Sequence, residues 1–185
     1  MTSQVAPEAS PAATSRPSSD LSALGAWRAF IQTHARLTHR LDEELQAAHS
    51  LSLAEYDALV QLVGAPDRRL RMSVLAERVL LSRSGITRLV DRLVADGMVE
   101  RSSCPTDARG SMATITPLGV SRLRAASRTH LDGVRRYFLD VIPEADQAVL
   151  EQALGRVTDG LGCNSAAATA VAAATACASD NPAKA

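Results

Sequence analysis

The chain has 185 residues, of which 46% are hydrophobic and 22% are charged. These values are typical of one globular domain and argue against a wholly disordered chain or a membrane protein. Aromatic residues make up only 3%, which argues against a carbohydrate-binding surface or an RNA platform that stacks bases on exposed rings. The three cysteines, at positions 104, 163 and 177, are an odd number at wide spacing and predict neither a disulfide framework nor a metal knuckle.

The net charge of zero conceals a basic block in the middle of the chain. Residues 68–110 carry nine Arg against five acidic residues, a net charge of +4, whereas residues 20–63 carry a net charge of −3. The only Lys is Lys184, so the block presents planar guanidinium groups, which suit phosphates and guanine edges. This distribution favours a nucleic-acid partner for the middle of the chain.

The first predicted elements are two helices. Apolar side chains at steps of three and four predict a long helix over about residues 21–49, with Trp27, His34 and Thr38 on the same stripe. Ser52 followed by Glu55 is a capping box and predicts a second helix over 53–63. Gly64 and Pro66 end that helix, and residues 68–71 are expected to be short and extended.

The next stretch predicts a helix-turn-helix. A short helix from Ser73 to Val79 or Leu80 is followed by a tight break near Leu81, and Ser82 caps a longer helix that Gly97 ends. The periodicity gives this longer helix a buried face made of Ile86, Leu89, Val90, Leu93 and Val94. The opposite face carries Ser84, Thr87, Arg88, Asp91 and Ala95.

A small antiparallel ribbon and two further helices complete the predicted fold. Residues 98–101 and 112–115 are strand-like on either side of a polar turn at 104–111. Thr116 caps a long helix that begins at Pro117, and a last helix runs from Pro143 to Leu161. The expected fold is therefore mainly α with a two- or three-stranded antiparallel ribbon, a winged helix-turn-helix inside a helical frame. Residues 1–19 and the Ala-rich residues 163–185 are expected to be disordered tails.

At this point the sequence resembles the MarR family of bacterial transcription regulators, over about Leu21 to Leu161. The stretch LSRSGITRLVDRLVADGMVERSSCPTDARG follows that family's recognition helix and wing, including the D-x-R signature at Asp107 and Arg109. The resemblance implies a single domain over 20–162, with dimerisation helices at 20–49 and 117–162 and a DNA-binding lobe at 53–116. It also implies a homodimer, a recognition helix in the major groove of an operator, and release by a small-molecule effector or by thiol oxidation.

The candidate DNA contacts lie in two places. Arg83, Ser84, Thr87 and Arg88 form the N-terminal outward part of the recognition helix, where side chains can reach base edges. Arg109 is expected at the wing tip, where a narrow minor groove attracts Arg, and Asp107 is expected to close the turn and orient it. The other Arg of the block are expected either to contact phosphates or to pair with acidic neighbours such as Glu77, Asp91 or Asp96.

Effector binding and redox sensing are separate hypotheses. In the family the effector pocket lies between the first two helices, the wing domain and the long fifth helix, which makes Trp27, Arg28, His34, Thr38 and Asp57 candidate effector contacts. Polar groups in an apolar seam also fix dimer register, so both roles stay open. The redox hypothesis places a reactive thiol at Cys104, at the base of the wing beside two arginines. The alternative is that Cys104 is a passive surface thiol.

The sequence therefore predicts a DNA-binding transcription regulator, a repressor that binds a pseudo-palindromic operator as a homodimer and is released by a small molecule. The alternatives are a redox-responsive regulator that uses Cys104 and a helical adaptor that binds protein and no DNA. Neither a phosphate loop nor a catalytic motif occurs, and the four histidines lack metal-site spacing. We expect no enzyme activity, cofactor or metal, no membrane contact, and a cytoplasmic, nucleoid-associated location.

Overall fold

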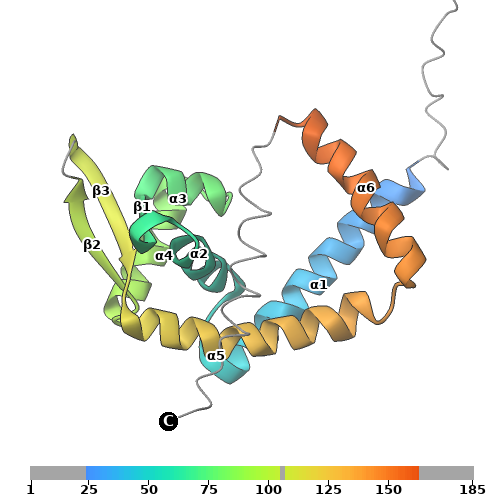
Figure 1. Cartoon of the computed structure of the whole chain (residues 1–185), viewed down its shortest axis with the longest axis horizontal. Helices are drawn as coiled ribbons and strands as arrows, with labels where there is room; N and C mark the ends of the chain where they lie inside the picture. The colour runs from blue at the N-terminus through green and yellow to red at the C-terminus, as the bar shows by residue number, and fades with distance from the viewer. Residues whose placement is uncertain (1–23, 105–106, 163–185) are drawn as a thin grey trace, which may run out of the picture. The chain divides into compact units, whose positions relative to one another are not determined.

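The computed structural model describes residues 24–104 and 107–162, without the side chains of Cys104 and residues 107–109. The expected tails at 1–19 and 163–185 lie outside the described residues. The chain divides into two compact units, residues 1–35 and 36–185, and the first helix contributes to both. The helices are α1 (Gly25–His49), α2 (Leu53–Val63), η1 (Pro66–Arg68), α3 (Met72–Arg78), α4 (Arg83–Ala95), α5 (Pro117–Val134), η2 (Arg135–Leu139) and α6 (Glu144–Gly160) (Figure 1). The strands are β1 (Arg69–Arg71), β2 (Val99–Cys104) and β3 (Asp107–Ile115).

The predicted capping box of α2 is confirmed. The Ser52 hydroxyl accepts a hydrogen bond from the Glu55 backbone N–H at 3.2 Å, and the Glu55 carboxylate accepts one from the Ser52 N–H at 2.9 Å. The Asp42 carboxylate on α1 accepts a further bond, at 2.7 Å, from the backbone N–H of Leu53. These bonds satisfy amide donors that the first turn of a helix leaves without partners.

The turn between α3 and α4 is a Schellman motif centred on Leu80. The Leu81 N–H donates to the Ala76 carbonyl at 2.9 Å, the Leu80 N–H donates to the Glu77 carbonyl at 3.2 Å, and Leu80 has a φ of 55°. Glycine usually occupies this left-handed position, because other residues bring their Cβ close to the backbone. Leu80 is also 89% exposed, so its side chain adds little packing in return.

Leu80→Gly is therefore expected to raise the free energy of unfolding by about 1 kcal/mol, because it removes the left-handed strain. Val79→Gly is the matched control, since Val79 has a φ of −94° and gains no relief. It should lower the same free energy. Urea denaturation of the three proteins measures both effects, and a Leu80→Gly protein no more stable than wild type would contradict the assignment of strain.

The buried face of α4 packs into the core of the DNA-binding lobe as predicted, with one exception. Ile86, Leu89, Val90 and Leu93 are buried, but Val94 is 37% exposed. Val94 lies eight positions after Ile86. With about 3.6 residues per turn, this separation places Val94 about 80° around the helix axis from Ile86, at the edge of the buried stripe. The side chains that share this core come from α2, α3, the sheet and α5, and include Leu59, Leu62, Leu75, Val99, Ala113 and Leu123.

The three strands form one antiparallel sheet in the order β1, β3, β2. The short extended segment predicted at 68–71 becomes β1, which pairs Leu70 with Ala113 of β3. The prediction of a polar turn over 104–111 was too long, since residues 99–104 and 107–115 are strands and Cys104 pairs with Asp107. Main-chain hydrogen bonds hold an exposed hairpin together without apolar alternation, so the sequence pattern understates the length of its strands.

The helix predicted from Pro117 begins as expected and then changes its winding. The Thr116 hydroxyl accepts from the Gly119 N–H at 3.0 Å and donates to the Gly97 carbonyl at 2.8 Å. After Val134 the helix continues as the π-helical turn η2, which the apolar spacing did not predict. A π-helical turn shifts the side chains after it around the axis and is often found at functional positions.

Helix α6 follows the predicted bounds but buries none of its residues in this chain. Its exposed large apolar side chains are Val149, Leu154 and Val157, and Leu161 at its C-cap is exposed as well. No helix among the described residues has both the length and the apolar character that a membrane crossing requires.

Candidate nucleic-acid interface

The N-terminal part of α4 presents a polar surface. Ser82, Arg83, Ser84, Thr87 and Arg88 line one shallow, open depression. Arg83, Ser84 and Arg88 are exposed and Thr87 is half-buried, so the outward face that the sequence predicted is confirmed as a surface. An open surface with a helix N-terminus in it can approach an extended anionic partner more easily than it can enclose a small ligand.

The hydroxyl groups of this surface have defined roles. The Ser82 hydroxyl caps α4 by accepting from the Gly85 N–H at 3.1 Å, and it lies 3.2 Å from the Ser84 hydroxyl. The Thr87 hydroxyl donates its proton to the Arg83 carbonyl at 2.8 Å. Thr87 can therefore offer an oxygen lone pair and a methyl group to a partner, but it is not a free donor.

The arginines of the basic block divide into paired and unpaired groups. Arg69 pairs with Asp67 at 3.1 Å, Arg92 with Glu55 at 2.6 Å and Arg101 with Asp91 at 2.5 Å. The sequence had suggested Glu77, Asp91 or Asp96 as partners for some arginines of the block, and Asp91 does pair with Arg101, but Arg92 has a different partner. The actual partner is 37 positions away in the chain, a contact that only the tertiary fold brings about.

The unpaired arginines are the ones available to an anionic partner. Among the described residues, Arg68, Arg78, Arg83 and Arg88 have no acidic side chain within ion-pair distance. Two of them, Arg83 and Arg88, lie on the polar surface of α4. An unpaired guanidinium group keeps its donors for phosphates or guanine edges, which makes these two the strongest candidates on α4.

The wing candidates lie on the two strands of the hairpin. Asp107 and Arg109 belong to β3, and Cys104 ends β2 opposite Asp107. Cys104 is therefore at the far end of the hairpin and not at the base of the wing, where the sequence analysis had placed it. The side chains of these three residues lie outside the described part of the structure.

The effector candidates fall into the two units of the chain. Trp27, Arg28 and His34 are exposed residues of the unit that ends at Ala35. There the ring centroid of Phe30 lies 6.3 Å from that of Trp27 and 6.2 Å from that of His34. In the other unit Thr38 is half-buried and Asp57 is exposed at the surface, although the protein packs around part of its carboxyl group.

Asp57 is the effector candidate with a strongly shifted ionisation. The protein around its carboxyl group desolvates the charged form and raises the pKa of Asp57 from 3.8 to about 6. The folded state therefore holds this proton more tightly than the unfolded chain does, and stability is lost as the pH rises through about 4 to 6.

Asp57→Asn is expected to raise the free energy of unfolding by about 1 kcal/mol at neutral pH, because the amide has no charge to desolvate. This figure is well below what the full shift would give, since the residue keeps contact with solvent. Below about pH 3, where both states hold the proton, the variant and wild type should be equally stable. Urea denaturation at the two pH values checks this, and a difference of the same size at both would contradict the shifted ionisation.

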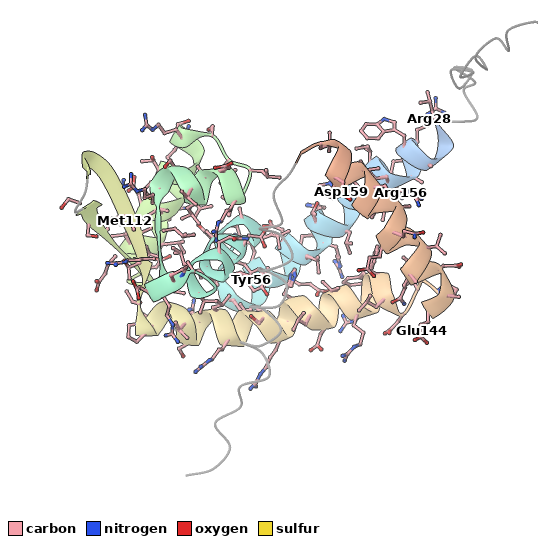
Figure 2. The ribbon with its side chains drawn as sticks, turned by 45° about the horizontal axis from the view of Figure 1, so that its top comes forward. Arg28, Tyr56, Met112, Glu144, Arg156 and Asp159 are labelled. Atoms are coloured by element: carbon pink, nitrogen blue, oxygen red, sulfur yellow. The ribbon has the colours of Figure 1, made fainter. Side chains whose placement is uncertain are left out.

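Two polar arrangements were not predicted. Tyr56 is buried between α2 and α5 (Figure 2), where its ring centroid lies 4.5 Å from that of His130 and its hydroxyl donates to the Ser127 hydroxyl at 3.5 Å. Burial lowers the pKa of His130, which favours its neutral form. The only signal in the sequence for these contacts of Tyr56 was the presence of polar residues inside an apolar stripe, such as Ser127 on α5.

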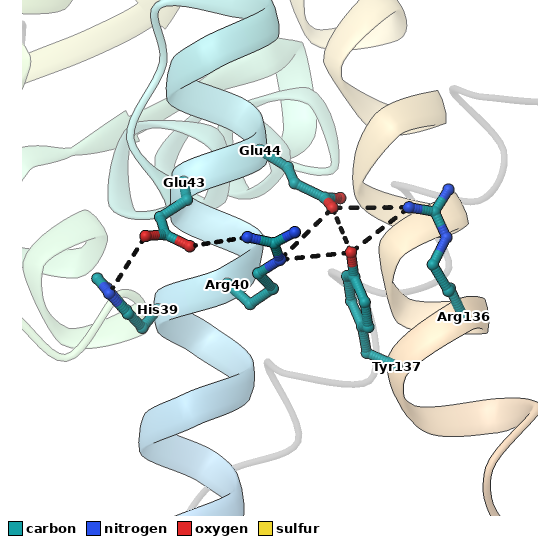
Figure 3. Close-up of polar contacts among 6 residues, drawn as sticks. All are labelled: His39, Arg40, Glu43, Glu44, Arg136 and Tyr137. Atoms are coloured by element: carbon teal, nitrogen blue, oxygen red, sulfur yellow. Dashed lines mark hydrogen bonds and ion pairs between the residues drawn. The ribbon is translucent and has the colours of Figure 1, made fainter.

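The second arrangement joins α1 to η2. The Tyr137 hydroxyl donates to the Glu44 carboxylate at 2.5 Å, and the guanidinium groups of Arg40 and Arg136 flank the tyrosine ring at 5.8 and 5.6 Å from its centroid (Figure 3). The hydrogen bonds from Arg40 and Arg136 to the hydroxyl raise the pKa of both guanidinium groups. This cluster of charges fixes η2 against the second half of α1.

A helix-turn-helix followed by an antiparallel hairpin defines the chain as a winged helix-turn-helix protein. Residues 49–110 match the model of the MarR family. The chain is 34% identical to Sco3205, a MarR family transcriptional regulator from Streptomyces coelicolor in complex with DNA, with a TM-score of 0.70 over 75% of this chain and 87% of that one. This protein therefore belongs to the MarR family of transcriptional regulators.

Two further comparisons agree with this assignment. PcaV, a transcriptional regulator from Streptomyces coelicolor in complex with its natural ligand, is 27% identical, with a TM-score of 0.58 over 72% of this chain and 89% of that one. An HTH-type transcriptional regulator from Bacillus cereus is 27% identical over 120 residues, which are 65% of this chain and 78% of its own length. The protein is thus a DNA-binding regulator and not an enzyme, as the sequence predicted.

Proposed function

We propose that the protein is a homodimeric repressor that reads a pseudo-palindromic operator. In this proposal α4 enters the major groove with Arg83, Ser84, Thr87 and Arg88, and the β2–β3 hairpin places Arg109, oriented by Asp107, in the adjacent minor groove. The observation that carries the proposal is that Arg83 and Arg88, on the exposed polar face of α4, have no acidic partner within the part of the chain that the structure describes. The complex of the related Sco3205 with DNA supports it.

The exposed apolar side chains of α6 support the dimer. Val149, Val157 and Leu161 are 65%, 59% and 72% exposed, and an apolar helix face of this kind is stabilised when another chain covers it. Two copies related by a twofold axis would present two α4 helices to one face of DNA. Half-sites should then lie about 34 to 36 Å apart, or one turn of the double helix.

A small molecule is proposed to release the repressor from DNA. It would contact Trp27, Arg28, His34, Thr38 and Asp57 and act only by binding the DNA-free arrangement of the dimer more tightly. The related PcaV is described with its natural ligand bound, which supports an effector here. Cys104 as a redox switch is the alternative proposal. The protein would act on the nucleoid in the cytoplasm.

Selection of bound duplexes from a random DNA pool tests the proposal. We expect a symmetric sequence with half-site centres about 10 base pairs apart, and sedimentation of the free protein as a dimer. The logarithm of the affinity for that sequence should fall steeply and linearly with the logarithm of the salt concentration. A helical adaptor that binds only protein would enrich no sequence and show no salt-dependent DNA affinity.

A further inference from the structure

Two consecutive residues of α4 form ion pairs with two different elements. The Nε atom of Arg92 donates to the Glu55 carboxylate on α2 at 2.6 Å, and the Arg101 guanidinium on β2 donates to the Asp91 carboxylate at 2.5 Å. Consecutive residues of a helix project about 100° apart. The two pairs therefore hold α4 from two sides, one toward the helical core and the other toward the hairpin.

Glu55, the partner of Arg92 on α2, is held firmly in place. Glu55 is only 7% exposed, and its second carboxylate oxygen accepts the Ser52 N–H in the capping box at 2.9 Å. Burial raises the pKa of Glu55, but the hydrogen bonds from Ser52 and Arg92 outweigh it and leave the pKa lowered. The carboxylate is thus charged and fixed in direction, so it restrains the position of the Arg92 side chain and the end of α4 that carries it.

The position of Arg101, the partner of Asp91 on the hairpin, is also fixed by the fold. Arg101 lies within β2, paired in register with Ala113 of β3, and its side chain is 33% exposed. Ala113 is fully buried, which ties this part of the hairpin to the core. The bond to Asp91 therefore connects the outward face of α4 to a strand that cannot move independently of the lobe.

The rotation of α4 about its own axis determines where its outward side chains lie. A side-chain atom about 6 Å from the helix axis moves by about 2 Å when the helix turns by about 20°. Groups that read bases must be held within about 0.5 Å of their productive positions. Contacts that fix the rotation of α4 therefore control base reading even if they never touch DNA.

We infer that Arg92 and Asp91, held by Glu55 and Arg101, are positioning residues that set the rotation of α4 and thereby the sequence specificity of DNA binding. This inference rests on the proposal that α4 reads base edges. It predicts that loss of either pair weakens binding to the selected operator much more than binding to random DNA, because phosphate contacts tolerate a small rotation and bidentate base contacts do not.

The experiment compares dissociation constants for the selected operator and for a random duplex of equal length. Glu55→Gln keeps a capping acceptor but removes the charge, and Arg92→Met keeps the apolar stem but removes the guanidinium. Each should lower the specificity ratio, which is the dissociation constant for the random duplex divided by that for the operator, by about tenfold, although the variants change the net charge in opposite directions. Arg92→Lys, which restores the charge, should recover part of the ratio.

Two controls separate positioning from other effects. Partial unfolding would weaken both DNA complexes by the same factor and leave the ratio unchanged. Arg78→Met removes an unpaired arginine of the same basic block, so it should weaken both complexes and also leave the ratio unchanged. If Glu55→Gln or Arg92→Met does not fold, Asp91→Asn decides the matter, because Asp91 is exposed and its loss should likewise lower the ratio.

The outcomes distinguish failure of the proposed function from failure of the positioning role. A wild-type protein that binds operator and random DNA equally would overturn the proposed function itself. A wild-type protein that discriminates, together with folded Glu55→Gln, Arg92→Met and Asp91→Asn variants whose ratios stay within twofold of it, would overturn the positioning role and leave the proposed function intact.

Discussion

Arg88→Ala is expected to weaken binding to the selected operator about 30-fold while the proposed dimer remains intact. Arg88 is exposed on the polar face of α4 and has no acidic partner among the described residues, so its guanidinium group is available for bidentate contact with a guanine. One such contact contributes about 1 to 3 kcal/mol of discrimination. Fluorescence anisotropy with labelled operator measures the affinity, and sedimentation checks the dimer.

Arg88→Lys is the matched variant that separates base reading from charge. Lys keeps the positive charge but cannot make the planar bidentate contact, so the account predicts that it recovers little of the lost affinity. Full recovery by Lys would mean that Arg88 contacts only phosphate.

Arg109→Ala should also weaken the operator complex without affecting the proposed dimer. Operator binding as tight as that of wild type at physiological salt would refute the role of the wing.

Gly119→Ala is expected to lower the free energy of unfolding by about 3 kcal/mol, because the first turn of α5 has no room for a methyl group. An added Cβ would lie 2.2 Å from the Met98 carbonyl oxygen and 2.7 Å from Cγ1 of Ile115. The first of these is a backbone atom next to β2, so it cannot move without shifting the strand. Overpacking of this kind costs about 1 to 3 kcal/mol and sometimes more.

The control for this variant is Gly155→Ala on α6. An added Cβ there meets no atom of the same chain within 4 Å, so the greater helix propensity of Ala should increase stability by up to about 1 kcal/mol. Thermal unfolding followed by circular dichroism compares the two. A Gly119→Ala protein with the melting temperature of wild type would contradict the close approach of α5 to residue 98.

Local signals in the sequence predicted the parts of the fold that depend on neighbouring residues. The caps at Ser52, Ser82 and Thr116 and the left-handed Gly97 each act within a few positions of the chain, and the structure contains all four. The face of α4 follows from helical periodicity in the same way. The winged helix-turn-helix could therefore be predicted before any coordinates were known.

The features that the sequence did not predict depend on contacts between distant parts of the chain. Glu55 was recognised only as a capping residue, because nothing near it in the sequence indicates that Arg92 packs against it. Leu80 carries no signal for a left-handed turn, since Gly or Asn usually marks that position. The π-helical turn η2 keeps the composition of an ordinary helix, and its position is fixed by contacts such as that of Tyr137 with Glu44.

Replacement of single purines of the selected operator by 7-deazapurines tests whether the outward face of α4 reads the major groove. This change removes the N7 acceptor from the major groove and leaves base pairing intact. We expect weaker binding for replacements in two blocks about one helical turn apart, and we expect one sensitive purine in each block to become insensitive in Arg88→Ala. If no such replacement changes operator binding by the wild-type protein by more than about twofold, α4 does not read the major groove.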